Sequence, residues 1–392
     1  MFSKVKKDIT RRYDMALKIL LVAPSSPFIL KSGGQQRTAL LYEALSGLGQ
    51  VDVLLLGQGR KLEVIKAPDP RVIAEAKWCK FPLGIAKYRP NMELTRKISE
   101  YLQFSQYDLI VGRYLNPICK LQLPQDAKTI VDLDDWDYEY DGSAWWTIKG
   151  ILTHIKSSYA RMVARQQLKR FNAFFFVSER DKASVPAVIS KLLPNIPFLP
   201  PVQPFPQTGN KNILFVGTLW YGPNRQGIEY FLKRCWPGIR ANVQGATLKL
   251  VGDASPSIRT LWEKYPDVRA PGFVDDLDTV YRDAAFTIAP IHNGGGTNIK
   301  IIESLAYGRA CVTTLRCANA FGATLLPQKG IVVADNDIAW VSNCTKLLLD
   351  QEERTKLAEC GHKFAVTHYT KTLFIDAVTS LVNEVIISKH NT

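Results

Sequence analysis

Short apolar runs alternate with amphipathic segments along the first half of the chain. The runs have the length and composition of buried strands, and they lie at Lys18–Ala23, Val51–Leu56, Leu109–Gly112, Thr129–Leu133 and Phe174–Val177. Helical patterns fall between several of them, for example at Gln36–Leu48 and Leu94–Phe104. Strands that alternate with helices in this way predict a parallel sheet joined by crossover helices.

A proline-rich segment separates this pattern from a second one. Residues 194–210 hold six prolines in seventeen positions, too many for a helix or a central strand. Beyond it, strand-like runs recur at Asn212–Val216, Thr247–Val251, Phe286–Ala289, Cys311–Thr314 and Ile331–Val333. Helices are expected at Gly227–Trp236, Leu277–Ala285, Asn298–Tyr307, Ile338–Asp350, Gln351–Val366 and Lys371–Ser388.

The predicted fold class is therefore α/β, with two doubly wound, Rossmann-like domains. We expect a basic N-terminal arm at residues 1–15, one domain at 16–200, a second at 201–370 and a final helix at 371–392. Open parallel sheets bind ligands beyond the carboxyl ends of their strands. Two such domains facing each other would place a ligand in the cleft between them.

The segment Ala289–Ala310, APIHNGGGTNIKIIESLAYGRA, joins three glycines to the start of a predicted helix. Glycines let a ligand approach the backbone closely because they carry no Cβ. The N-terminus of the helix offers unpaired N–H groups and a partial positive charge, which suit a diphosphate. Lys300 and Glu303 lie three residues apart, hence on one face, where they can contact phosphate oxygens and ribose hydroxyls. The segment predicts a nucleotide-diphosphate site.

The same residues also fit a glycine-rich turn that only packs. Neither the dinucleotide fingerprint G-x-G-x-x-G nor the NTPase loop G-x-x-x-x-G-K-[ST] occurs here. A phosphate site at this position has to be of another kind.

Composition narrows the class of protein. The net charge of +14 favours anionic partners, but the basic residues are spread out and show no nucleic-acid-binding signature. No apolar run reaches the ~18 residues of a membrane span, and the N-terminus does not read as a signal peptide. The seven cysteines have no metal-ligand spacing, which indicates free thiols in a reducing cytoplasm.

Residues 211–334 resemble the donor-binding domain of family-4 glycosyltransferases of the GT-B fold, the group 1 glycosyl transferases. The resemblance rests on FVGTLWYGPNRQG, ATLKLVGDASPSI and GFVDDLDTVYRDAAFTIAPIHNGGGTNIKIIESLAYGRACVTT, in the expected order and spacing. The first half is similar more weakly, through KILLVAPSSPFILKSGGQQRTALLYEAL and FFFVSERDK. The GGGT motif indicates a particular branch of the family.

The resemblance implies a set of donor-binding residues. Phosphate contacts would come from Gly33, Gly34, Gly217, Thr218, Arg225, Gly294, Gly295, Gly296, Thr297, Asn298 and Lys300. Glu303 would bind the ribose, and Val251, Gly252 and Val274 would line the base. The final helix would match the segment that crosses back onto the first domain.

Two positions depart from the pattern of many family members. Gly295 stands where they have a glutamate eight residues before the one matching Glu303, and Thr218 stands where they have an arginine. Asn224 or Arg225 falls near the position of their lysine.

The resemblance implies transfer of a sugar from a nucleotide sugar to an acceptor hydroxyl, with retention of anomeric configuration. No metal or other cofactor is required in that scheme, and Lys300 would stabilise the leaving diphosphate. The acceptor expected is a lipid-linked or cell-surface glycan intermediate. The alternatives are a non-catalytic nucleotide-sugar or membrane-surface binding protein, or a sugar-nucleotide epimerase, on the same scaffold.

An acidic cluster, DLDDWDYEYD, follows the predicted strand Thr129–Leu133. Like charges this close repel unless a cation or hydrogen-bond donors lie among them. Asp134 or Asp135 could orient or deprotonate the acceptor hydroxyl. The D-x-D at Asp132–Asp134 also matches a metal motif of a different glycosyltransferase fold, and a solvated acidic loop is the plainer alternative.

A basic segment, residues 145–170, opens with Trp145–Trp146 and carries six basic side chains and no acidic one. They are Lys149, Lys156, Arg161, Arg165, Lys169 and Arg170. A basic helix with an aromatic tip can lie on an anionic membrane surface. It can equally be a helix that closes the first domain with its basic face in water.

Overall fold

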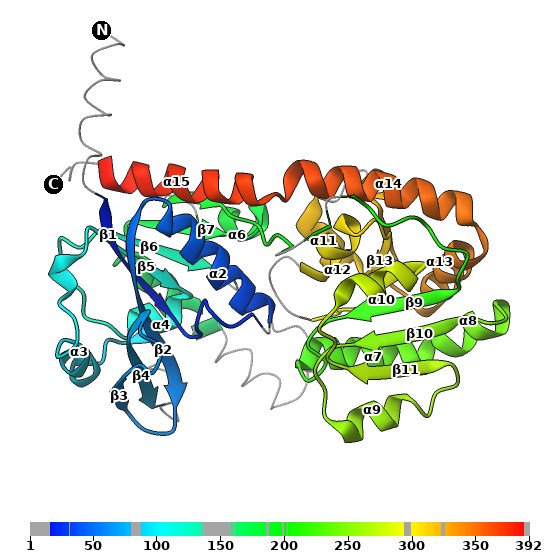
Figure 1. Ribbon diagram of the computed structural model, residues 1–392, viewed down its shortest axis with the longest axis horizontal. Helices are drawn as coiled ribbons and strands as arrows, with labels where there is room; N and C mark the ends of the chain where they lie inside the picture. The colour runs from blue at the N-terminus through cyan, green and yellow to red at the C-terminus, as the bar shows by residue number, and fades with distance from the viewer. Residues whose placement is uncertain are drawn as a thin grey trace, which may run out of the picture. The chain divides into compact units, whose positions relative to one another are not determined.

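The chain divides into two compact units. Unit 1 comprises residues 1–193 and 374–392, and unit 2 comprises residues 194–373. The computed structural model describes residues 16–30, 32–79, 88–134, 136, 158–159, 161–185, 188–197, 200–201, 203–293, 299–322 and 326–387. Each unit is an α/β domain built on one sheet (Figure 1).

Unit 1 contains an eight-stranded sheet of order β3-β4-β2-β1-β5-β6-β7-β8. Its strands are β1 (Leu17–Ala23), β2 (Gly49–Gly59), β3 (Glu63–Lys66), β4 (Val72–Cys79), β5 (Leu109–Arg113), β6 (Thr129–Leu133), β7 (Ala173–Phe176) and β8 (Ile189–Leu192). All neighbours are parallel except β3 and β4, which pair antiparallel at one edge. The strand order reverses at β1, which has β2 on one side and β5 on the other.

The helices of unit 1 cover this sheet. They are α2 (Gly33–Ser46), α3 (Met92–Ile98), α4 (Leu115–Cys119), α6 (Glu179–Ala183) and the part of α15 (Lys371–Ile387) that follows residue 373. Residues 161–168 are also helical. Helix α2 packs against β1 and β2, and α4 packs against β5 and β6. The core between them is apolar, with Leu20, Ile110 and Phe176 wholly buried.

Unit 2 contains a six-stranded parallel sheet of order β11-β10-β9-β12-β13-β14. Its strands are β9 (Asn212–Val216), β10 (Thr247–Val251), β11 (Val268–Gly272), β12 (Phe286–Ala289), β13 (Cys311–Thr313) and β14 (Ile331–Val333). In chain order this is the 3-2-1-4-5-6 arrangement of a doubly wound domain, which reverses between β9 and β12. Ligands of such sheets bind at that reversal.

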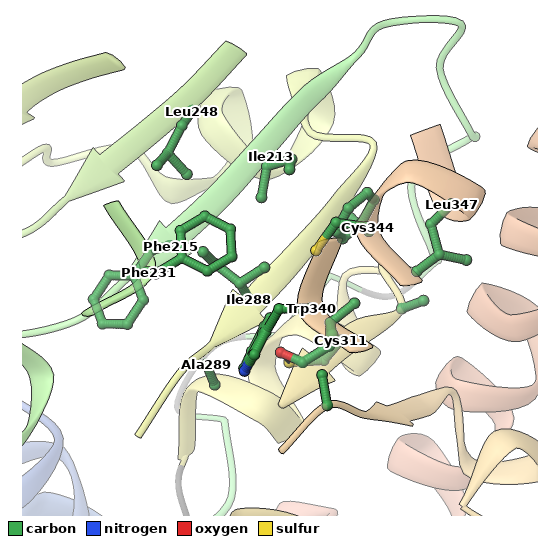
Figure 2. Close-up of a cluster of buried hydrophobic side chains, with 14 of the residues drawn as sticks. Ile213, Phe215, Phe231, Leu248, Ile288, Ala289, Cys311, Trp340, Cys344 and Leu347 are labelled. Carbon is green, nitrogen blue, oxygen red and sulfur yellow. Dashed lines mark hydrogen bonds between the residues drawn. The ribbon is translucent and has the colours of Figure 1, made fainter. Parts of the chain in front are cut away.

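The helices of unit 2 are α7 (Gly222–Arg234), α8 (Trp236–Asn242), α9 (Pro256–Trp262), α10 (Leu277–Asp283), α11 (Ile299–Ala306), α12 (Leu315–Ala318), α13 (Asp337–Leu349) and α14 (Gln351–His368). Figure 2 shows the core that several of them share with the sheet, where Phe215, Ile288 and Trp340 lie together. The rings of Phe231 and Trp340 meet edge to face at 5.5 Å. Apolar burial of this kind supplies most of the stability of the domain.

Several predicted elements differ from the observed ones. The helix predicted at Leu94–Phe104 ends at Ile98, and a separate 3₁₀ turn covers Phe104–Gln106. Helix α2 begins at Gly33, where the Ser32 side chain caps it by accepting a hydrogen bond from the Gln35 N–H. Gly33 and Gly34 therefore lie in the first turn of that helix, and the helix predicted at Gln36–Leu48 begins three residues earlier.

Strands β3, β4, β8 and β11 were missed because none is a continuous apolar run. In β4 buried and more exposed residues alternate, and β3, β8 and β11 lie at sheet edges. Strand β11 also contains Pro271, which only an edge strand or a bulge accommodates easily.

Candidate active site

The carboxyl ends of β9 and β10 approach each other closely in unit 2. A Cβ on Gly252 would lie 1.8 Å from the carbonyl oxygen of Gly217, so only glycine fits at position 252. The Gly217 N–H donates to the Val251 carbonyl at 3.0 Å. These contacts bring the backbone of both loops to the sheet edge where the strand order reverses.

Helix α7 packs equally closely against the end of β12. A Cβ on Gly227 would lie 2.0 Å from the carbonyl oxygen of Pro290. The end of β12 is thereby held beside the loop that follows β9. Helix α11 begins nine residues after Pro290, so its N-terminal end belongs to the same edge.

Helix α11 carries Lys300 and Glu303, and both are half-buried. The Lys300 side chain faces Gly217: its Cε lies 3.2 Å from where a Gly217 Cβ would be. Its ammonium group also lies 5.9 Å from the centre of the Phe215 ring. Burial lowers the pKa of Lys300, and the nearby Glu303 and cysteine thiols oppose that shift. A cation thus lies against the backbone at the end of β9.

Glu303 accepts a hydrogen bond at Oε2 from the Tyr281 hydroxyl on α10, at 3.0 Å. Burial raises the pKa of Glu303 to about 7, although the Tyr281 hydrogen bond and Lys300 both lower it. The Tyr281 ring stacks on Tyr307, with centroids 4.1 Å apart and planes 8° apart. Glu303 is held from one side by an ordered aromatic pair.

The first turn of α7 presents Asn224 rather than Arg225 to this edge. The Asn224 amide donates to the Thr218 carbonyl at 2.8 Å, and its nitrogen lies 3.3 Å from the position of a Gly217 Cβ. Arg225 instead pairs with Glu229 on the exposed side of α7 at 2.7 Å. Val274 packs beside Val251 and Tyr281 in a small apolar cluster. Of the predicted residues Gly217 and Arg225, Gly217 lies next to Lys300 and Arg225 is ion-paired on the surface of α7.

A buried ion network lies at the carboxyl ends of β5 and β6 in unit 1. Arg37 on α2 donates to both carboxylate oxygens of Asp132, at 2.9 and 2.7 Å. Arg113 lies 3.1 Å from Asp132 Oδ2 and donates to Asp134 Oδ2 at 2.7 Å. Arg37, Arg113 and Asp132 are at most 2% exposed, and the Asp134 side chain is 14% exposed. The two arginines are the cations that relieve the repulsion expected in the acidic cluster.

The two arginines of the network compensate the negative charges of the D-x-D motif. Burial alone would lower the pKa of Arg113, but the charges of Asp134 and Asp132 raise it above its ordinary value. Both carboxylates of the motif are bound by guanidinium groups, an arrangement that disfavours divalent-metal binding by the same oxygens. Within the described ranges, we find no cluster of three or more His, Cys, Asp or Glu suited to a metal ion.

Tyr114 connects this network to the start of α2. Its φ of 67° is unusual for a residue with a side chain. Arg113 Nη2 donates to its hydroxyl at 3.1 Å, and that hydroxyl lies 3.4 Å from where a Gly34 Cβ would be. Gly34 therefore lies at the same end of the sheet as Asp134.

Residues 210–350 match the family described as glycosyl transferases group 1. The chain is a glycosyltransferase with a group 1 glycosyl transferase domain. A 44.6 kDa protein named as uncharacterized, from the cps region of Klebsiella pneumoniae, is 21% identical over 356 residues, 83% of this chain and 89% of that protein. The matched domain contains the whole sheet of unit 2, with Lys300 and Glu303.

Solved structures share the GT-B fold of this glycosyltransferase over nearly its whole length. Sucrose-phosphate synthase from Thermosynechococcus elongatus has a TM-score of 0.68 and 17% identity, covering 95% of this chain and 100% of that one. S. aureus TarM with fondaparinux, alpha-GlcNAc-glycerol and UDP has a TM-score of 0.64 and 8% identity, with coverage of 95% and 100%. Anabaena HepE with UDP-glucose has a TM-score of 0.62 and 13% identity, covering 94% of this chain and 100% of that one.

Some predicted site residues of the glycosyltransferase lie outside the described residues. They are Asp135, Gly294, Gly295, Gly296, Thr297 and Asn298. The structure is described again from Ile299, one residue before Lys300.

The basic segment is described from residue 161 onward, with residues 158–159. Ala164 and Leu168 are buried, whereas Arg165 and Lys169 are exposed, so residues 161–169 present a basic face to solvent. Arg170 does not share it, because its guanidinium donates to the carbonyls of Cys119 and Leu121 at 3.2 and 2.8 Å. Among the described helices, none is long and apolar enough to span a membrane.

Sequence reasoning missed Arg37, Arg113 and Tyr281. Arg37 lies 95 residues from Asp132, and Tyr281 lies 22 residues from Glu303, so neither contact has a local pattern. One feature of the sequence could have indicated the role of Arg113. Arg113 ends the apolar strand β5, and the neighbouring strand β6 ends among acidic residues.

Proposed function

We propose that this glycosyltransferase moves a sugar from a nucleotide diphosphate to an acceptor hydroxyl with retention of anomeric configuration. The observation that carries the proposal is that Lys300 and Glu303 lie on one helix at the strand-order reversal of unit 2. Lys300 lies against the backbone of Gly217, where a diphosphate can be bound by a cation and by N–H groups. Glu303 supplies a carboxylate for ribose hydroxyls.

In the reaction, the bond from the sugar C1 to the diphosphate oxygen breaks while the acceptor hydroxyl oxygen bonds to C1 and its proton passes to the leaving diphosphate oxygen. Negative charge grows on the leaving diphosphate, so a preorganised cation lowers the barrier. Lys300 fills that role in our proposal, and the backbone at Gly294–Asn298 supplies the N–H donors. No covalent carboxylate nucleophile and no metal takes part.

We assign donor binding to unit 2 and acceptor binding to unit 1. Asp134 supports the second assignment, because it lies at the carboxyl end of β6 and is partly exposed. Its charge is already compensated by Arg113, which favours orienting the acceptor hydroxyl over deprotonating it. Asp135, the next residue, remains the alternative candidate.

A uridine nucleotide is the first donor to test. The TarM and HepE structures contain UDP or UDP-glucose. The relative from the cps region of Klebsiella pneumoniae is consistent with a role in polysaccharide synthesis. We propose a cell-surface glycan or a lipid-linked saccharide as the product.

We also propose that the enzyme works at the cytoplasmic face of a membrane, bound peripherally. The support is the basic face of residues 161–169, where Arg161, Arg165 and Lys169 lie about one helical turn apart. Arg165 and Lys169 are exposed, and Arg161 is half-exposed. Each basic residue near an anionic leaflet contributes about 1 kcal/mol of attraction. Such a surface would hold the enzyme close to a lipid-linked acceptor.

Binding measurements test the donor site directly. Thermal-shift screening against UDP, GDP, ADP and CMP compounds selects the nucleotide, and calorimetry then compares variants. Lys300→Ala and Glu303→Ala should each weaken binding by ~1–3 kcal/mol, the scale for losing a hydrogen bond to a charged group. Lys346→Ala, an exposed lysine paired with Glu353, is the matched control. Wild-type affinity in both folded site variants would show that the site is misplaced.

A further inference from the structure

Tyr281 is fixed at three points of unit 2. Its ring, 1% exposed, stacks on Tyr307. Its backbone carbonyl accepts a hydrogen bond from Arg309 Nε at 2.9 Å, and Arg309 is itself wholly buried. Its hydroxyl donates to Glu303 Oε2 at 3.0 Å. The hydroxyl therefore has a set position, because ring and backbone are both held.

The hydroxyl of Tyr307, the other ring of the stack, has a different hydrogen-bond acceptor. Tyr307 donates to Asp278 Oδ1 at 2.9 Å, on the exposed side of α10. The two tyrosines thus share one stack, but the Tyr281 hydroxyl donates to Glu303 whereas the Tyr307 hydroxyl donates to Asp278. This difference provides a control within the structure itself.

A carboxylate has two oxygens and accepts several hydrogen bonds. The Tyr281 hydrogen bond to Oε2 restrains the orientation of the Glu303 carboxylate, and the remaining lone pairs can accept further hydrogen bonds. A hydrogen-bond donor to a carboxylate also stabilises the ionised form of that carboxylate. An ionised carboxylate accepts hydrogen bonds about twice as strong as a neutral group does.

We propose that Tyr281 is a positioning residue of the donor site, which favours the ionised form of the Glu303 carboxylate and orients it for the ribose hydroxyls of the nucleotide. This inference rests on the proposed function, because it takes Glu303 as the ribose ligand. Tyr281 itself does not touch the donor. It acts through Glu303 alone.

The electrostatic surroundings of Glu303 make this role measurable. Lys300 faces it from the preceding turn of α11, Tyr281 from α10, and Tyr307 from the residue after α11, with Asp278 behind Tyr307. Burial raises the pKa of Glu303 to about 7, and the Tyr281 hydroxyl counteracts that rise. Removal of the hydroxyl should therefore raise the pKa further and leave more Glu303 protonated at neutral pH.

The alternative is a purely packing role, in which Glu303 merely satisfies a buried hydroxyl. Tyr281→Phe and Tyr307→Phe would then behave alike, since each removes one hydroxyl from the same stack. Affinity would change equally at all pH values or not at all. A positioning role instead predicts a loss that depends on pH.

The test is the pH dependence of affinity for whichever of UDP, GDP or ADP binds best, measured from about pH 5.5 to about pH 9. For Tyr281→Phe we expect the midpoint to shift upward by about one pH unit, with an affinity loss of about tenfold below the midpoint and recovery above it. Tyr307→Phe should keep the wild-type midpoint. A uniform loss, or an unshifted midpoint in Tyr281→Phe, would overturn the proposal.

Glu303→Gln separates this inference from the function on which it rests. If Glu303→Gln binds nucleotide as wild type does, the ribose assignment itself fails. If Glu303→Gln weakens binding while Tyr281→Phe behaves like Tyr307→Phe, only the positioning role fails. The ionisation of Glu303 can also be followed without nucleotide by ¹³C NMR, where Tyr281→Phe must raise the pKa of Glu303 and Tyr307→Phe must not.

Discussion

Arg37 and Asp132 form a two-point ion pair, with N–O distances of 2.9 and 2.7 Å, although 95 residues separate them in the chain. The same guanidinium donates to the Leu193 carbonyl at 2.8 Å, the last residue of unit 1 before the chain enters unit 2. The Phe374 ring, where the chain re-enters unit 1, lies 5.7 Å from it. The Arg37 side chain therefore contacts the residue at which the chain leaves unit 1 and the residue at which it returns.

Removal of Asp132 should destabilise the protein strongly. Asp132→Ala leaves Arg37 and Arg113 buried without their shared carboxylate, and loss of one partner of a buried pair costs ~3–5 kcal/mol. Urea unfolding monitors the change. The control is Asp69→Ala, which breaks an exposed pair with Arg71 and should have a far smaller effect. Equal destabilisation by the two variants would contradict a structural role for the network.

Asp134 is expected to act on the acceptor rather than on the donor. Asp134→Asn keeps the side-chain shape but removes the charge, so sugar transfer should fall while nucleotide affinity stays at the wild-type value. Transfer rates and calorimetry on the same preparation check both parts. Restoration of transfer by added Mn²⁺ would instead favour a metal role for the D-x-D motif.

The raised pKa of Glu303 predicts a specific pH dependence of stability without ligand. The folded state holds a proton on Glu303 up to about pH 7, whereas the unfolded chain loses it near 4.5. The folded state thus binds more protons in that window, and the contribution of Glu303 to stability falls as the pH rises. The difference in unfolding free energy between wild type and Glu303→Gln should change by on the order of 1–3 kcal/mol from about pH 4.5 to about pH 7.5. A constant difference across that range would show that Glu303 titrates normally.

The basic face of residues 161–169 should bind anionic vesicles reversibly. Charge attraction is screened within about 8 Å at physiological salt, so high salt should release the protein. Changing Arg161, Arg165 and Lys169 to glutamine should abolish co-sedimentation. Changing Lys61, Arg96 and Lys97 to glutamine, elsewhere in unit 1, alters the net charge equally and should leave binding intact. Equal recovery with neutral and anionic vesicles would refute the membrane proposal.

The central strands were predictable because burial on both faces requires continuous apolar residues. Strands β9, β10, β12 and β14 begin and end where the apolar pattern predicts. Edge strands such as β11 carry polar residues and proline on their exposed side, so their pattern is broken. The start of α2 lies three residues before the predicted one, because the Ser32 cap, and not the apolar pattern, sets the first helical residue.

The geometry of the candidate site was predictable only where its residues are neighbours in sequence. Lys300 and Glu303 lie on one helix, and their spacing alone places them on a common face. The partners that hold them come from other elements: Gly217 from the end of β9 and Tyr281 from α10. Such contacts depend on strand order and helix packing, which a local pattern does not encode.

Turnover of nucleotide sugars is the most direct test of the account. The wild-type enzyme is incubated with UDP-, GDP-, ADP- and CMP-sugars, with and without lipid extract as a source of acceptor, and nucleotide release is measured. We predict nucleoside diphosphate release from at least one donor, lost in Lys300→Ala and retained in Lys346→Ala. No release from any donor, release unaffected by Lys300→Ala, or epimerised sugar without transfer would contradict the assignment of this chain as a sugar-transferring enzyme with its donor site at Lys300 and Glu303.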